Sequence, residues 1–179
     1  MRIRTYRPVD MPLLLEIQQL AAQTDGTTSA SPTDFAAWLS NPALETAHNV
    51  FIVTDDDETN TWGQGDTLEG IEGEIIGYTT LTLHQDKRAY HFLCQGAVSP
   101  QYRRQNAGRA LLICALNRAR ICAAEFEFEA EQEGKALYLE ALLPLADPAS
   151  SRLAAKCDMQ PVDEPAPAGM QLYRRELYD

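Results

Sequence analysis

The chain has 179 residues, 45% of them apolar and 23% charged, which is the composition of an ordinary soluble globular protein. It is long enough for one domain with a full hydrophobic core, and no apolar run approaches the roughly 18–20 residues of a membrane span. The net charge of −11 argues against a nucleic-acid partner, since phosphates would be repelled. Residues 1–6 lack the apolar core of a signal peptide, so we expect a cytoplasmic protein without membrane association.

The cysteines and histidines do not form the pattern of a metal site. The cysteines stand in apolar stretches without C-x-x-C spacing, at Cys94, Cys114, Cys122 and Cys157. Such cysteines are typically reduced core residues. The histidines are scattered, at His48, His84 and His91. We therefore expect no bound metal.

The first half of the chain predicts two strands and two helices. A strand is expected near residues 3–6. A helix follows from Asp10, an N-cap candidate, to about residue 23, because its apolar residues recur at helical spacing. A shorter helix is expected over about residues 31–41, and the β-branched run 50–53 predicts the second strand.

Residues 55–74 differ from the rest of the chain in composition. They contain eight acidic residues, four glycines and no lysine or arginine. A segment of this kind cannot bury enough apolar surface to order itself. We expect a solvated, mobile loop between two strands.

The second half predicts two strands, a long helix, a strand, a short helix and a last strand, at residues 75–83, 90–98, about 108–131, 136–143, 148–156 and 170–177. The first two of these strands are expected to form a hairpin. The resulting order, β-α-α-β-β-β-α-β-α-β, predicts an α/β protein with helices on the faces of a mixed sheet. We interpret residues 1–179 as one domain.

An arginine-rich loop between the strand ending at Val98 and the helix beginning near Gly108 is the best candidate for a binding site. The first N–H groups of a helix have no internal partner, so a phosphate can bind there. Gly108 allows the backbone to approach the anion, and Arg103, Arg104 and Arg109 reverse the local charge of an acidic protein. The loop is not a P-loop, because no Lys-Ser/Thr pair follows Gly108. It is not a dinucleotide-binding fingerprint either, because that motif needs three glycines and only one is present. An ordinary helix N-terminus remains the alternative.

The pattern Val98-x-Pro100-x-x-Arg103-x-Gln105-x-x-Gly108-x-Ala110 resembles the coenzyme A signature of the GNAT acetyltransferases, Q/R-x-x-G-x-G/A. Its place between the fourth strand and the third predicted helix is also that of the family. The resemblance implies a GNAT fold, with a mixed, mostly antiparallel sheet of six to seven strands flanked by four helices. It implies acetyl-CoA as cosubstrate and no metal.

The resemblance assigns cofactor-binding roles to ten residues: Ala97, Val98, Arg103, Arg104, Gln105, Asn106, Ala107, Gly108, Arg109 and Ala110. Backbone N–H groups from Gln105 to Ala110 would hold the pyrophosphate, with Arg103 and Arg104 beside it. Ala97 and Val98 would pair with the pantetheine amides as an added strand does. An N–H group of the same strand would stabilise the oxyanion when an amine attacks the thioester.

Two departures from the family pattern concern catalysis. Family members often carry a tyrosine in the helix at 148–156 as general acid, and the matching residue here is Ala154. No carboxylate occurs between Tyr90 and Pro100, where some members place a base. Glu140 is therefore the candidate base and Tyr138 the candidate acid. The alternatives are an ion-paired strand carboxylate and a packed core tyrosine.

The function expected from the resemblance is acetyl transfer to a primary amine of a small molecule or peptide. Attack on the thioester would be direct, without a covalent enzyme intermediate. The alternatives are a non-catalytic acyl-CoA-binding module, a degenerate half of a paired GNAT assembly, and a relative that shares only the fold. A homodimer is an open alternative for the oligomeric state.

Overall fold

A seven-stranded sheet, with strand order β1-β2-β3-β4-β5-β7-β6, organises the computed structural model of the chain, which describes residues 1–55 and 73–178. The strands are β1 (Arg2–Thr5), β2 (Val50–Asp55), β3 (Glu74–Gln85), β4 (Ala89–Val98), β5 (Ala136–Pro144), β6 (Gln160–Pro161) and β7 (Met170–Glu176). Neighbouring strands run antiparallel except for β4 and β5, which run parallel. The expected mixed, mostly antiparallel sheet is thus confirmed.

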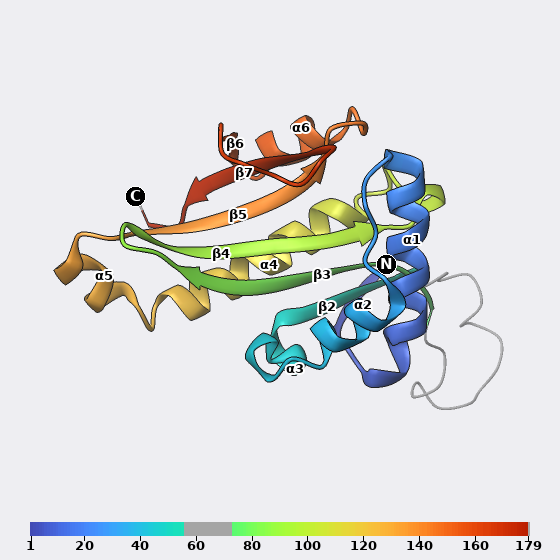
Figure 1. The fold of residues 1–179 in the computed structure, drawn as a ribbon, viewed down its shortest axis with the longest axis horizontal. Helices are drawn as coiled ribbons and strands as arrows, with labels where there is room; N and C mark the ends of the chain where they lie inside the picture. The colour runs from blue at the N-terminus through green and yellow to red at the C-terminus, as the bar shows by residue number, and fades with distance from the viewer. Residues whose placement is uncertain (56–72, 179) are drawn as a thin grey trace.

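Six α-helices occur in these residues, compared with four expected from the sequence. They are α1 (Met11–Asp25), α2 (Pro32–Leu39), α3 (Thr46–Asn49), α4 (Ala107–Ala123), α5 (Glu127–Glu133) and α6 (Ser150–Ala155). In Figure 1, α1 and α2 lie in front of the sheet and α4 lies behind it. No helix in residues 1–55 or 73–178 combines the length and hydrophobicity that crossing a membrane requires.

The long helix expected over residues 108–131 is in fact two helices. The N–H groups of Glu125 and Phe126 bond back to Cys122 and Ala123 in a turn that separates α4 from α5. The turn places the Phe126 ring 5.1 Å from the ring of buried Tyr90, measured between centroids. This aromatic contact explains why the helical pattern is interrupted, and Gly134 ends α5 as expected, with φ 63°.

Asp10 is the N-cap residue of α1, as expected, but its side chain makes no capping hydrogen bond to this helix. Its carboxylate instead accepts two hydrogen bonds from the Arg4 guanidinium, at 2.7 and 2.8 Å, and one from the Arg7 N–H at 2.8 Å. Ser31 does cap α2, accepting from the Asp34 N–H at 3.1 Å. The acidic stretch expected to be mobile falls largely on residues 56–72, outside the described residues.

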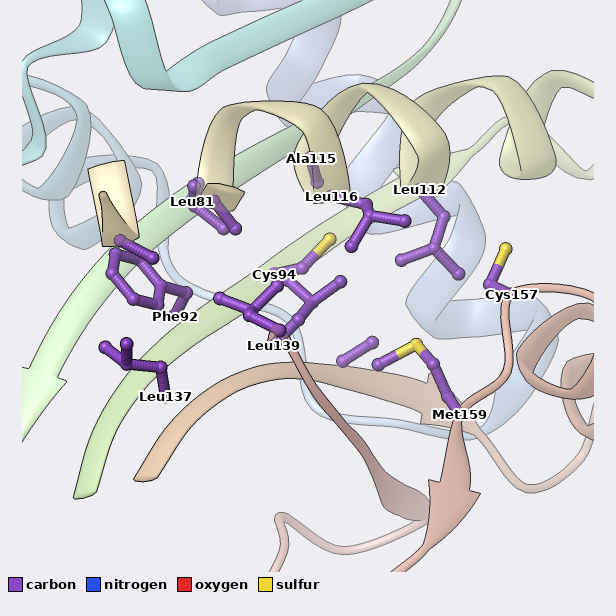
Figure 2. Packing of buried hydrophobic residues seen from close by; sticks show 14 of the residues in the cluster. Leu81, Phe92, Cys94, Leu112, Ala115, Leu116, Leu137, Leu139, Cys157 and Met159 are labelled. Carbon is purple, nitrogen blue, oxygen red and sulfur yellow. The ribbon is translucent and has the colours of Figure 1, made fainter. Parts of the chain in front are cut away.

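The main core lies between the sheet and α4. Alternate β4 residues Tyr90, Phe92 and Cys94 are buried on this face, as a half-covered strand predicts. Figure 2 shows Leu112 and Leu116 of α4 directed toward the sheet near Cys94 and Leu139, with Cys157 and Met159 at one end of the cluster. A second cluster on the opposite face joins α1 and α2 to β2 and β3, through Leu14, Phe35, Ile52 and Tyr78.

Candidate active site

The site begins where the two parallel strands β4 and β5 separate. Their pairing ends at Cys94 and Ala141, although both strands continue, over residues 95–98 and 142–144. The two strands visibly diverge in Figure 1. The separation leaves an opening in the middle of the sheet, beside the helices on both faces.

The register of β3 and β4 decides which backbone groups face this opening. The Asp86 N–H bonds to the Ala89 carbonyl, and the Ser99 N–H bonds to the Ile76 carbonyl. Hydrogen-bonded and non-hydrogen-bonded pairs alternate in an antiparallel ladder, so odd-numbered β4 residues bond to β3. The N–H groups of Gly96 and Val98 therefore point toward β5, past its last paired residue. Ala97, which was expected to bind pantetheine through its backbone, is the hydrogen-bonded partner of Tyr78 instead.

Gly96 is required for this arrangement. A Cβ atom at this position would lie 2.1 Å from the Tyr78 carbonyl oxygen and 2.8 Å from Thr79 Cα. Both are backbone atoms of β3 and cannot yield as a flexible side chain does. β4 approaches β3 here while it departs from β5, so this glycine allows the opening to form.

A cavity of about 680 Å³ passes through the opening, within the range of small-molecule sites. One end lies at the start of α4 and α6. The other end lies among α1, α2 and the segment before β7, where Phe35, Trp38, Tyr78 and Met170 contribute apolar surface. The cavity therefore connects an arginine-rich end with an aromatic end through the gap between β4 and β5.

The loop that precedes α4 is held in an unusual backbone conformation. Arg104 and Asn106 adopt left-handed φ angles of 65° and 68°, which non-glycine residues rarely do. The first helical hydrogen bond of α4 runs from the Ala110 N–H to the Asn106 carbonyl. The N–H groups of Ala107, Gly108 and Arg109 consequently lack a helical partner, as in any helix start. Gly108 itself lines the cavity.

Four cations surround this end of the cavity: Arg104, Arg109, Arg152 and Lys156. None of them forms a salt bridge with any part of the chain that the structure describes. In a protein of net charge −11, four unpaired cations on one cavity wall are a strong attraction for a polyanion. Arg152 and Lys156 were not predicted from the sequence, although their spacing of four residues on a predicted helix was an available signal.

Arg103 has a different role from the other arginines. Its guanidinium binds both carboxylate oxygens of Asp25, at 2.6 and 2.8 Å, and lies 3.7 Å from Asp147. The hydrogen bonds to Asp25 raise the pKa of Arg103 above its ordinary value. Arg103 thus joins the end of α1 to the loop before α4. Its charge is already balanced by Asp25, without a phosphate.

Seven of the ten predicted cofactor residues line the cavity: Ala97, Val98, Arg103, Arg104, Asn106, Gly108 and Arg109. Gln105, Ala107 and Ala110 do not, and Ala107 packs in the core with 1% of its surface exposed. A side-chain role for these three is therefore not supported, whereas the N–H groups of the loop remain available.

The two catalytic candidates lie outside the cavity. Glu140 is buried on β5, where its carboxylate accepts from Arg174 Nε at 2.7 Å and lies 2.9 Å from His91 Nδ1. The Tyr138 ring lies 4.9 Å from the Arg174 guanidinium, on the same sheet face. Glu140 is therefore the ion-paired strand carboxylate that was considered as the alternative, and its position does not support a role as base. The position of Tyr138, also outside the cavity, does not support a role as acid.

Ala154, at the position of the family's tyrosine, is fully buried in the main core and does not line the cavity. The cavity is lined instead by Ser150, Arg152 and Leu153 of α6 and by its C-cap residue Lys156. The thiol in the lining is Cys94, and burial raises its pKa to about 11. Within residues 1–55 and 73–178, no cluster of histidine, cysteine and acidic side chains could hold a metal ion.

Several solved structures of acetyltransferases have a fold similar to that of this chain. Ribosomal-protein-S18-alanine N-acetyltransferase from Escherichia coli is 18% identical, covering 98% of this chain and 93% of its own, with a TM-score of 0.60. A phosphinothricin acetyltransferase from Sinorhizobium meliloti in complex with acetyl-CoA is 17% identical, with coverages of 98% and 87% and a TM-score of 0.64. A GCN5-related N-acetyltransferase from Sphaerobacter thermophilus is 16% identical, with coverages of 93% and 49% and a TM-score of 0.62.

Among curated protein sequences, none matches the chain significantly. The sequence profile of the acetyltransferase (GNAT) family matches residues 18–142, which include the fork between β4 and β5 and the loop before α4. This match spans more than half of the chain, and the fold agrees with it. The chain belongs to the GNAT family of acetyltransferases.

Proposed function

We propose that this protein is an acetyl-CoA-dependent N-acetyltransferase that acts on a primary amine. The observation that carries the proposal is the continuity of the cavity. It joins four unpaired cations and the start of α4 to the exposed N–H groups of Gly96 and Val98. A ligand with a polyanionic end and an extended amide chain matches both features.

The chain's own groups suit direct transfer. The N–H groups of Gly96 and Val98 could donate to the pantetheine amide oxygen and to the thioester oxygen, where negative charge develops during attack. In the reaction the amine nitrogen bonds to the acetyl carbon, the carbon–sulfur bond breaks, and the amine proton replaces the acetyl group on coenzyme A. The Cys94 thiol stays protonated near neutral pH, because burial raises its pKa to about 11, which supports transfer without an acyl-enzyme.

A non-catalytic acyl-CoA-binding module is the second candidate function. The observation in its favour is that the described cavity lining contains no histidine, and two of its carboxylates, Asp25 and Asp147, are engaged by Arg103. The match to half of the Sphaerobacter protein is also compatible with one half of a paired assembly.

Calorimetric titration with acetyl-CoA and coenzyme A, followed by a thiol-release assay on an amine panel, tests the proposal. We expect micromolar affinity, about −7 to −8 kcal/mol, and thiol release with at least one amine. Binding without release would support the module, and absence of binding would refute both candidate functions.

A further inference from the structure

The cations at the α4 end of the cavity exceed what a diphosphate needs. A diphosphate diester carries one negative charge on each phosphorus. Four cations that form no salt bridge with residues 1–55 or 73–178 meet here at a helix N-terminus. Coenzyme A carries a third phosphate, a monoester on the 3′ oxygen of its ribose, with a charge of about −1.5 to −2 at neutral pH. The three phosphates of coenzyme A together carry about −3.5 to −4, close to the charge of the four cations.

The cations also divide into two groups by position. Arg104 stands in the loop itself, next to the N–H groups of α4. Arg152 and Lys156 are four residues apart at the end of α6, so they share a helix face. α6 packs against the first turn of α4, because a Cβ atom at Gly108 would lie 3.5 Å from Leu153 Cδ2.

Arg109 belongs to the second group. Its charge lowers the pKa of Cys157, just beyond α6, although burial, which raises that pKa, is the larger effect. Arg109 directly follows Gly108, which lies beside Leu153 of α6, and it lines the same cavity as Arg152 and Lys156. Arg109, Arg152 and Lys156 are all exposed, so a phosphate can reach them without unfolding any element.

We propose that Arg109, Arg152 and Lys156 form a second anion subsite that binds the 3′-phosphomonoester of coenzyme A. The protein then discriminates coenzyme A from dephospho-coenzyme A, which lacks only this group. The inference rests on the proposed function, since it concerns the same ligand. Charge-assisted hydrogen bonds to a phosphate are among the stronger polar contacts, so binding at this subsite should contribute measurably to the affinity for coenzyme A.

The test compares the dissociation constants of coenzyme A and dephospho-coenzyme A for the parent and for Arg152→Ala/Lys156→Ala. We expect the parent to bind coenzyme A about tenfold more tightly or better. In the double variant this ratio should fall to within about twofold, because coenzyme A weakens while dephospho-coenzyme A does not. Added salt should reduce the parent's ratio, since the subsite is exposed.

Arg88→Ala/Arg120→Ala is the matched control, because it removes the same charge from two exposed residues that do not line the cavity. It should keep the parent's ratio. A parent that binds both ligands equally would overturn the subsite and leave the proposed function intact. Equal weakening of both ligands in Arg152→Ala/Lys156→Ala would also overturn it. A parent that binds neither ligand would refute the proposed function itself.

Discussion

Gly108→Ala separates the needs of the fold from those of the cofactor site. The added methyl group would lie 3.5 Å from Leu153 Cδ2 and 3.9 Å from Val98 Cγ2, which are ordinary van der Waals distances. Gly108 is the second residue of α4, where alanine is preferred over glycine by up to about 1 kcal/mol. The variant should therefore be as stable as the parent or more stable, with the melting temperature raised by at most about 2–4 °C.

The same methyl group should weaken ligand binding, because it occupies the cavity wall beside the N–H groups that would hold the diphosphate. We expect at least a tenfold loss of coenzyme A affinity in calorimetry, about 1.4 kcal/mol. Gly108→Glu should bind no coenzyme A at all, since it also adds a negative charge. Unchanged affinity in Gly108→Ala, in a parent that binds, would refute the close approach of the anion to this residue.

Gly134→Ala provides the contrasting control. Nothing lies within 4 Å of a Cβ atom at Gly134, but its φ of 63° is unfavourable for alanine. This variant should lose about 1 kcal/mol of stability and keep its affinity for coenzyme A. The two glycine substitutions thus have opposite expected effects on stability and on binding.

Three further predictions concern the body of the protein. Gly96→Ala should lower the free energy of unfolding by more than about 3 kcal/mol, because the added Cβ atom would lie 2.1 Å from the Tyr78 carbonyl oxygen. Denaturant titration measures this loss, and a loss under about 1 kcal/mol would show that β3 and β4 can separate. Cys94→Ala should retain transfer activity, and mass spectrometry should find no acetyl group on Cys94 of the parent; a labelled Cys94 would contradict direct transfer. Burial disfavours the charged form of Asp10, but hydrogen bonds and charges from Arg4 and Arg7 outweigh it and lower its pKa. The stabilisation from Asp10 should therefore be complete above about pH 4 and disappear as the pH falls through the lower folded value, and Asp10→Asn should reduce this acid sensitivity.

The elements predicted correctly from sequence are those with a strong local pattern. The hairpin of β3 and β4 was predicted by two strand-forming runs around a short polar segment, and its turn is closed by Asp86, which accepts from the N–H groups of Arg88 and Ala89. The start of α4 was predicted by a glycine and clustered arginines that are close in sequence. These features depend on contacts between near neighbours, so periodicity and composition reveal them.

The break between α4 and α5 was not predictable in the same way. Residues 108–131 are helical in their local pattern, and the interruption follows from the contact of Phe126 with Tyr90, on a strand far back in the chain. Likewise, Glu140 looks like a free strand carboxylate in the sequence. Its engagement by Arg174 and His91 depends on the pairing of β5 with β7 and with β4.

By itself, the sequence predicted a sheet of the family's kind, which the structure confirms, and a candidate anion-binding loop before the helix that is now α4. Only the tertiary structure decided which groups face the cavity. Arg103 and Asp25 are 78 residues apart, and their pairing balances the charge of one predicted phosphate ligand. The N–H group of Gly96, and not that of Ala97, faces the opening because strand register sets the direction of each N–H group. Register and helix packing arise from contacts between distant segments, and a pattern of neighbouring residues does not specify them.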